Sequence, residues 1–281
     1  MGFDIIALLK FIFLGLVQGI TEVLPISSSG HVELMKALIG LDTNQGLVFL
    51  IILNTGSFAT FVIIYFKKIM ELSKSLVIYL FVSSQRAKHY DNFIYASKIL
   101  VACIPAGIFG LLLNNMIENF MIVYNLLFVS IGLLTTATVL YFVSGIRFRK
   151  GSGHLSWLDI LFVGLAQAVA IFPGISRSGM TTSTALKRGS GITAALNFSF
   201  MIYIPISFAT ILLMIFDFTS DDARILTKID VFYYFFAFVA AMIATFIAYK
   251  LIFNIFRSGK LKYFSYYCFG VGFLALLLYV L

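Results

Sequence analysis

Residues 15–31 read GLVQGITEVLPISSSGH and place a set of polar groups inside an apolar run. The stretch carries Gln18, Glu22, Pro25, three consecutive serines and His31. In hydrocarbon each of these polar groups is costly unless it is paired or lines a wet cavity. A glutamate and a histidine in such a run therefore predict a functional site within the membrane.

A second stretch, residues 164–179, reads GLAQAVAIFPGISRSG and repeats the first at a distance of 149 positions. The shift superposes the glycine, leucine and glutamine at the start of the two stretches and the I-S-x-S-G at their ends. It also places Ser28 on Arg177 and Glu22 on Ile171. The chain is therefore predicted to be a diverged internal repeat whose two copies carry different chemistry.

The composition predicts a polytopic membrane protein. Of the 281 residues 61% are hydrophobic and 11% are charged, and the mean hydropathy is +1.03. Soluble domains are about one quarter charged. The net charge of +8 does not indicate nucleic-acid binding, because the basic residues sit in short segments between apolar runs. Cys103 and Cys268 lie inside apolar runs, so a disulfide or a cysteine metal site is not expected.

Each half of the chain is expected to form one re-entrant helix–loop–helix hairpin and three transmembrane helices. The first hairpin covers residues 3–40 and the second covers residues 157–188, each broken at a proline. The spans are predicted at residues 47–66, 93–113 and 120–143 and at residues 191–216, 231–256 and 263–281, with an interfacial helix and loop at 70–92. Because three spans carry the chain to the opposite side of the membrane, the second half begins on that side and is inverted relative to the first. The fold class is therefore an all-α single membrane domain of two inverted-topology repeats, about 1–145 and 156–281.

The distribution of basic residues gives an independent prediction of topology. The loops predicted on one side hold most of the lysines and arginines: Lys67, Lys68, Lys74, Arg86, Lys88, Arg147, Arg149, Lys150, Lys187, Arg188, Arg257, Lys260 and Lys262. The loops on the other side hold Arg224 and Lys228 among five acidic residues. The positive-inside rule then places both termini outside, in a multi-pass protein of the plasma membrane.

Residue spacing in the first copy suggests chemistry centred on Glu22. Gln18 and Glu22 are four apart and share a helix face. Glu22 is a candidate metal ligand, general base or neutralised carboxyl, and a polar packing pair with Gln18 is the alternative. Pro25 breaks the helix before a serine loop that includes Ser27 and Ser28, which is suited to holding an anion at the start of the next helix. His31 is placed for proton transfer or for activating a serine.

The second copy supplies an arginine where the first has a serine. Arg177 is flanked by Ser176 and Ser178, with Thr181 one turn further on. A planar guanidinium suits bidentate binding of phosphate. A structural salt bridge from Arg177 to Glu22 is the alternative, and both can hold in the resting state.

The two motifs resemble those of the undecaprenyl-diphosphate phosphatase family, the membrane enzymes linked to bacitracin resistance. That family carries an (E/Q)xxxE segment followed by LPxSS[ST]GH, and a second segment PGxSRSGxT. Residues 18–22 here are QGITE, residues 24–31 are LPISSSGH, and residues 173–181 are PGISRSGMT. The resemblance covers nearly the whole chain. Three departures from the commoner family pattern stand out. Position 18 is Gln, which the family allows but which removes one possible metal carboxylate, and Glu33 falls where an apolar residue is usual. In the next span Asn54 takes a position often filled by His or Gln, and Leu50 replaces an acidic residue often found nearby.

The resemblance implies hydrolysis of a C55 polyprenyl diphosphate to its monophosphate and inorganic phosphate, which recycles the lipid carrier of cell-wall synthesis. It implies a divalent cation, Ca²⁺ or Mg²⁺, and an active site open to the outer face. Carried over by position, the catalytic residues are Glu22, Ser28 and His31, the phosphate-binding residues are Arg177, Ser176, Ser178, Thr181 and Ser27, and the metal ligands are Glu22 and Gln18. The partners are the lipid substrate and the bilayer, not nucleic acid, and a homodimer is left open.

The mechanism expected from these residues is in-line attack by Ser28, with His31 moving the proton and Glu22 orienting His31 or holding the cation. Attack by water, without a phosphoserine, stays open. The competing function is a polyprenyl-phosphate flippase or anion transporter that uses the same midplane site, since inverted repeats with broken helices are also a transporter architecture. A nucleophile with an acid–base group favours the enzyme, because binding alone requires neither.

Overall fold

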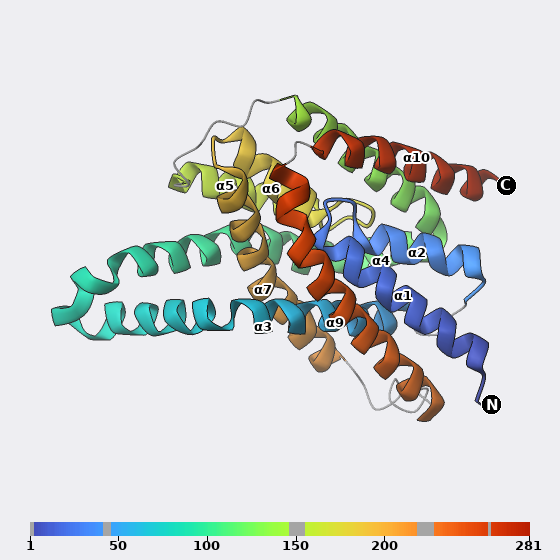
Figure 1. The fold of residues 1–281 in the computed structure, drawn as a ribbon, viewed down its shortest axis with the longest axis horizontal. Helices are drawn as coiled ribbons and strands as arrows, with labels where there is room; N and C mark the ends of the chain where they lie inside the picture. Colours follow the sequence, from blue (N-terminus) through green and yellow to red (C-terminus); the bar gives the residue numbers. More distant parts are fainter. Residues whose placement is uncertain (1–2, 42–45, 146–154, 218–227, 258–259) are drawn as a thin grey trace.

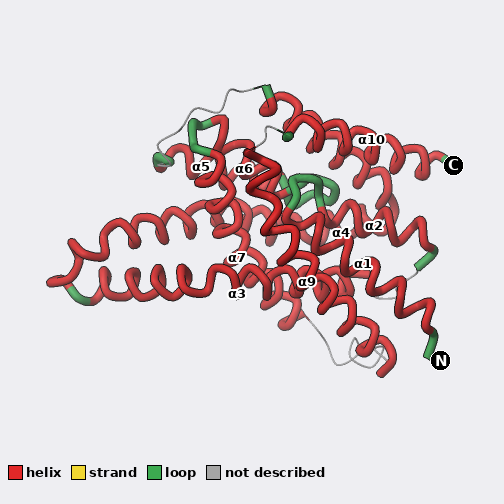
Figure 2. The backbone as a smooth tube through the Cα atoms, viewed as in Figure 1, coloured by secondary structure: helices red, strands yellow, loops and turns green. Residues whose placement is uncertain are grey.

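The computed structural model describes residues 3–41, 46–145, 155–217, 228–257 and 260–281, and this part of the chain is entirely helical apart from short turns (Figures 1 and 2). The helices are α1 (Ile5–Val23), α2 (Ser28–Ile39), α3 (Gly46–Phe81), the short 3₁₀ helix η1 (Ser83–Gln85), α4 (Arg86–Ser144), α5 (Trp157–Val169), α6 (Arg177–Lys187), α7 (Ile192–Asp217), α9 (Lys228–Arg257) and α10 (Leu261–Val280). The all-α prediction is confirmed.

Seven of the described helical segments are long and apolar enough to cross a membrane. They are Ile5–Val23, Val48–Phe81, Ser83–Leu113, Asn125–Ser144, Ile192–Leu213, Asp230–Phe256 and Leu261–Val280. Large apolar side chains such as Ile63, Leu112 and Phe142 remain exposed on these segments, which is the surface that a bilayer covers. The predicted spans at 191–216, 231–256 and 263–281 correspond to α7, α9 and α10. α1, predicted as one arm of a re-entrant hairpin and not as a span, has 19 residues and is long and apolar enough to cross a membrane.

The predicted interfacial helix after residue 66 is not a separate helix. α3 continues through Lys67 and Lys68 to Phe81, a single helix of 36 residues. No glycine or proline occurs between Gly56 and Pro105, and lysine is a good helix former, so nothing in the sequence stops the helix there. η1 then reverses the chain, and Figure 1 shows α3 and the first part of α4 side by side as a long projecting pair.

The predicted loop at residues 114–119 is also helical in the structure. α4 is one helix of 59 residues, and residues 111–131 contain neither glycine nor proline to interrupt it. Figure 1 shows that its course bends, so that its last part lies along α10. Two hydroxyls join this pair of helices, since Ser130 donates to the Gly272 carbonyl at 2.9 Å and Ser265 donates to the Ala137 carbonyl at 2.7 Å.

Glycines let α1 approach α9 closely. A Cβ atom on Gly15 would lie 2.3 Å from the Ala237 carbonyl oxygen, and one on Gly19 would lie 2.4 Å from that of Ala241. Gly164 lets α5 approach α4 in the same way, because a Cβ on Gly164 would lie 2.8 Å from the Ala102 carbonyl oxygen of α4. Each broken helix therefore packs on a long apolar helix through a small residue at an equivalent repeat position.

The two helix breaks lie together in the interior. α1 ends at Val23, two residues before Pro25, and α5 ends at Val169, before Pro173. Figure 2 shows the connecting loops of these two breaks beside each other near the middle of the molecule. The residues singled out by the sequence motifs occupy these loops and the helix ends that they join.

Candidate active site

The carboxylate of Glu22 is the hub of the hydrogen bonds between the two motifs. Its Oε2 accepts hydrogen bonds from Gln18 Nε2 at 2.9 Å and from Ser28 Oγ at 2.6 Å. Its Oε1 accepts one from Arg177 Nη2 at 2.8 Å. Glu22 is buried at the last turn of α1, so an unpaired carboxylate would be costly there. A single side chain thus connects the serine of one hairpin to the arginine of the other.

Arg177 is held on three sides. Besides Glu22, its Nη1 lies 3.4 Å from Ser207 Oγ, and its guanidinium carbon lies 4.3 Å from the centre of the Tyr203 ring. Tyr203 donates its hydroxyl hydrogen to Asn54 Oδ1 at 2.8 Å, which fixes the ring beneath the guanidinium. The arginine side chain keeps about a quarter of its surface exposed, with a relative exposure of 24%. A fixed, partly open guanidinium is suited to receiving an anion.

The starts of α2 and α6 are built in the same way. Ser27 caps α2 by accepting from the Gly30 amide at 3.3 Å, and Ser176 caps α6 by accepting from the Gly179 amide at 3.0 Å. Both helices therefore begin at the site with their positive ends. Ser27 also has a φ of 70°, a conformation that L-residues rarely adopt and that is typical of constrained functional loops.

The two loops contact each other reciprocally. A Cβ atom on Gly30 would lie 3.1 Å from the Gly174 Cα, and one on Gly179 would lie 3.2 Å from the Pro25 carbonyl oxygen. In the sequence repeat of 149 positions, Gly30 corresponds to Gly179 and Gly174 corresponds to Pro25. Each copy of the repeat therefore makes the same contact to the other copy. Ser178 Oγ adds a hydrogen bond across the same junction to the Leu24 carbonyl at 3.1 Å.

His31 does not take the position expected for the base of Ser28. Its Nδ1 lies 2.7 Å from the Ser27 carbonyl oxygen and its Nε2 lies 2.9 Å from the Tyr267 hydroxyl, so both ring nitrogens have other partners. The His31 and Tyr267 rings also stack, with centres 5.4 Å apart and planes 9° from parallel. Ser28 is bonded to Glu22 instead. The expected chain from Ser28 through His31 to Glu22 is therefore not the arrangement seen.

The remaining predicted residues divide into two groups. Ser176 and Ser178 lie at the junction, with their hydroxyl oxygens 3.4 Å apart, as Ser27 and Ser29 do at 3.5 Å. Thr181 is buried one turn into α6, and its hydroxyl contacts the Arg177 carbonyl at 2.8 Å and the Ser199 hydroxyl at 2.6 Å. In this arrangement Thr181 supports the helix that carries Arg177.

Sequence reasoning missed Tyr203, Ser207 and Tyr267. They come from α7 and α10, more than 170 residues from the first motif, and nothing adjacent in the sequence marks them. Their only signal is a polar hydroxyl within an apolar span, which needs a partner in hydrocarbon. Asn54 gives a similar signal, because its polar amide also lies within an apolar span.

The described residues do not fit a divalent cation held by protein ligands alone. No group of three or more His, Cys, Asp or Glu side chains gathers anywhere in the described ranges. Gln18 and Glu22, the expected ligands, bond to each other, and the second oxygen of Glu22 already faces the positive charge of Arg177. A hard cation such as Ca²⁺ needs six to eight oxygen ligands, so one carboxylate beside an arginine is a poor site.

Fold and site together define an integral membrane protein with a buried carboxylate–serine–arginine centre at the junction of two broken helices. The comparisons with known proteins assign the family. The sequence model of the family described as "Bacitracin resistance protein BacA" matches residues 11–274, and this chain belongs to that family.

Proteins named undecaprenyl-diphosphatase are similar over almost their full length. "Undecaprenyl-diphosphatase 2" of Bacillus thuringiensis (strain Al Hakam) is 40% identical over 272 residues, covering 96% of this chain and 97% of the relative. "Undecaprenyl-diphosphatase" of Oceanobacillus iheyensis is 40% identical over 270 residues, covering 96% of each chain. "Undecaprenyl-diphosphatase 1" of Halalkalibacterium halodurans is 36% identical over 269 residues, covering 96% of this chain and 95% of the relative.

Proposed function

We propose that this chain is an undecaprenyl-diphosphatase, an integral-membrane hydrolase that converts the C55 polyprenyl diphosphate to its monophosphate and inorganic phosphate. The family and the names of the relatives support the reaction. The observation that carries the site is the bridging carboxylate of Glu22, bonded to Ser28 on one side and to Arg177 on the other. This arrangement provides a nucleophile, a base and an anion-binding group within one set of hydrogen bonds.

The geometry favours Glu22 over His31 as the base for Ser28. The Ser28 hydroxyl already donates to Glu22 Oε2 at 2.6 Å, which is within the reach that proton transfer requires. Attack by Ser28 Oγ on the terminal phosphorus would pass the proton to Glu22 and release the lipid monophosphate. Water would then hydrolyse the phosphoserine and release inorganic phosphate. Direct attack by water held on Glu22 is the second route, and it needs no phosphoserine.

Arg177 and the N-terminal ends of α2 and α6 would supply the electrostatic stabilisation of the phosphate groups. Phosphoryl transfer depends mainly on positioning and on stabilising charge on the transferred group. When the diphosphate arrives, its oxygens would compete with Glu22 for the Arg177 guanidinium. Weakening that bridge would free Glu22 to accept the Ser28 proton, so substrate binding and activation of the base are linked. Ser27, Ser176 and Ser178 would complete the lining around the phosphate.

His31 is assigned to positioning the loop. It bonds to the carbonyl of Ser27, the residue with the unusual φ, and to Tyr267 from α10. Holding this carbonyl fixes the turn that presents Ser28. This positioning role beside the nucleophile is proposed in place of the expected role of His31 as the proton carrier.

The proposal includes a divalent cation that is bound together with the substrate. The diphosphate itself offers oxygen ligands, so Ca²⁺ or Mg²⁺ would be held mainly by the substrate, and Glu22 and Gln18 are the side chains that would contribute protein oxygens. When bound, the cation would supply charge neutralisation on the phosphates.

The inverted repeat and the re-entrant hairpins are supported by the reciprocal contacts between Gly30 and Gly174 and between Gly179 and Pro25. Each copy of the repeat thus makes the same contact to the other copy, which is the pattern that an approximate two-fold axis between the copies produces. We place both termini and the opening of the site on the outer face, on the basis of the basic loops. A homodimer stays a prediction. The flippase or transporter alternative finds no support in the cited relatives, which are named as diphosphatases.

The test is hydrolysis of undecaprenyl diphosphate by the purified protein in detergent, with both products identified. Equal amounts of lipid monophosphate and inorganic phosphate establish the reaction. Protein that binds the lipid without releasing phosphate under Ca²⁺ or Mg²⁺ would instead make the site a carrier.

A further inference from the structure

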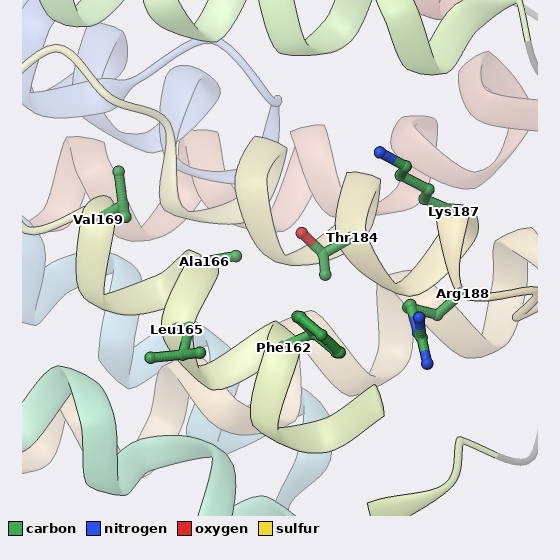
Figure 3. A pocket seen from close by; sticks show the side chains of 7 residues that line it. All are labelled: Phe162, Leu165, Ala166, Val169, Thr184, Lys187 and Arg188. Atoms are coloured by element: carbon green, nitrogen blue, oxygen red, sulfur yellow. The ribbon is translucent and has the colours of Figure 1, made fainter. Parts of the chain in front are cut away.

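A groove of about 390 Å³ lies between α5 and α6, away from Glu22. Four side chains of α5 form its apolar wall: Phe162, Leu165, Ala166 and Val169. Figure 3 shows them in a row along one helix. Phe162, Leu165 and Val169 are each more than 40% exposed, so this wall faces the surroundings and not the protein core. From Phe162 to Val169 the helix rises about 10 Å, which is long enough to line several methylenes of an acyl chain.

The other side of the groove is polar and basic at one end. Thr184, Lys187 and Arg188 line it from α6 and the residue that follows it, and Figure 3 shows both basic side chains toward the Phe162 end. The Arg188 guanidinium lies 4.8 Å from the centre of the Phe162 ring. The last carbonyls of α6 are occupied, because the amides of Arg188, Gly189 and Ser190 bond back to the helix. The negative end of the α6 dipole therefore repels an anion less strongly at this end of the groove.

Among the described residues that line this end, Lys187 carries one positive charge that no acidic side chain pairs with. Arg188 Nε donates to Asp159 Oδ1 at 2.5 Å, and this ion pair is neutral as a unit. Lys187 is exposed, and no ion pair of Lys187 is found among the described residues. Trp157 begins α5, five residues before Phe162, and Lys98 Nζ lies 5.6 Å from the centre of its ring. Tryptophan with lysine is the composition of a membrane–water interface. The groove therefore joins a cationic site at the interface to an apolar surface that leads into the bilayer.

We propose that this groove binds one anionic phospholipid, such as phosphatidylglycerol, with its phosphate beside Lys187 and Thr184 and one acyl chain along α5. The unpaired positive charge of Lys187 favours an anionic head group over a zwitterionic one. Basic pockets between membrane helices bind anionic head groups in this way. The proposal concerns a resident lipid and does not depend on the hydrolytic function.

The test uses Trp157, the only tryptophan of the chain, as the reporter. The purified protein is placed in phosphatidylcholine bilayers that contain a fixed fraction of either phosphatidylglycerol or phosphatidylcholine brominated near the head group, since bromine quenches tryptophan fluorescence on contact. Brominated phosphatidylglycerol is expected to quench Trp157 more than brominated phosphatidylcholine does. Lys187→Gln is expected to lower this preference by about fivefold. Lys88→Gln, a loss of one exposed lysine in the first turn of α4, is the matched control and is expected to leave it unchanged.

Equal quenching by the two brominated lipids in the unaltered protein would overturn the proposal. So would an equal loss of preference in Lys187→Gln and Lys88→Gln, because the effect would then be general attraction to the surface. Unbrominated undecaprenyl monophosphate is added in a last arm. If it restores the fluorescence more effectively than the same amount of unbrominated phosphatidylglycerol, the groove belongs to the carrier lipid and the assignment of a phospholipid is wrong.

Discussion

Glu22 and Arg177 are 155 residues apart in the sequence, and their side chains meet at 2.8 Å in the interior of the protein. The second carboxylate oxygen of Glu22 holds the Ser28 hydroxyl at 2.6 Å. The bridge is therefore both a clamp between the two hairpins and the connection between the proposed nucleophile and the phosphate-binding group. Changes at these three residues separate those roles.

Ser28→Ala is expected to reduce phosphate release by several orders of magnitude, because the serine route loses its attacking oxygen. The initial rate with undecaprenyl diphosphate measures this directly. Ser29→Ala is the matched control, since Ser29 is the next residue and its hydroxyl has only a 3.5 Å contact with Ser27. Retention of most activity in Ser28→Ala would exclude the phosphoserine and leave the water route.

Arg177→Lys is expected to lower kcat by about 10²–10³-fold, because an ammonium keeps the charge but loses the planar pair of donors. Arg177→Ala should also unfold more easily, by about 3–5 kcal/mol, because it leaves the buried Glu22 carboxylate without its partner. Thermal unfolding in detergent measures the second effect. Adding Glu22→Gln to Arg177→Ala should recover part of that stability, and no recovery would show that the bridge is not what stabilises this junction.

Tyr267→Phe is expected to lower phosphate release several-fold, because the hydroxyl that holds His31 Nε2 is lost while the stacked ring remains. The control is Tyr263→Phe, one turn earlier on α10, where the ring is 69% exposed. Since Tyr267 acts through the Ser27 turn, kcat should fall while KM stays near its original value. An unchanged kcat would remove His31 and Tyr267 from the positioning of the loop.

Gly19→Leu is expected to lower the melting temperature sharply or to prevent folding, because a Cβ there already lies 2.4 Å from the Ala241 carbonyl oxygen of α9. Overpacking of this kind costs about 1–3 kcal/mol or more. Gly107→Ala is the control, because a Cβ at Gly107 meets no atom within 4 Å. Two variants of equal stability would contradict the close packing of α1 on α9.

Removing divalent cations with EDTA is expected to reduce phosphate release without changing the melting temperature of the protein free of substrate. The reason is that the described residues provide no cluster of ligands for a cation. A large rise in melting temperature on adding Ca²⁺ or Mg²⁺ alone would show that a built cation site exists.

Much of the fold follows from local features of the sequence. Pro25 and Pro173 mark the two breaks, the 149-residue shift pairs the two stretches that contain them, and the apolar runs of the second half become α7, α9 and α10. The end of α3 could not be predicted in this way, because Lys67 and Lys68 resemble the end of a span. In the folded chain, Lys68 instead pairs with Glu71, and α3 continues to Phe81 against α4.

The candidate site is predictable only in part for a related reason. Glu22, Ser28 and Arg177 lie in motifs, and the possibility of their ion pair follows from burial of opposite charges. The partner of His31 comes from α10, 236 residues away, and Tyr203 approaches Arg177 from α7. Such contacts depend on how helices pack, which the sequence near the motifs does not encode. Proximity in the sequence favoured His31 as the base, whereas the turn at Ser27 directs its ring toward α10.

The most direct test of the central claim is the initial rate of phosphate release from undecaprenyl diphosphate by Glu22→Gln, compared with the unaltered protein at equal folded concentration. Glutamine keeps the size of the side chain and one oxygen acceptor but cannot take the Ser28 proton or neutralise Arg177. The account predicts a loss of nearly all activity in a protein that still folds. A Glu22→Gln variant that releases phosphate at close to the original rate would contradict it.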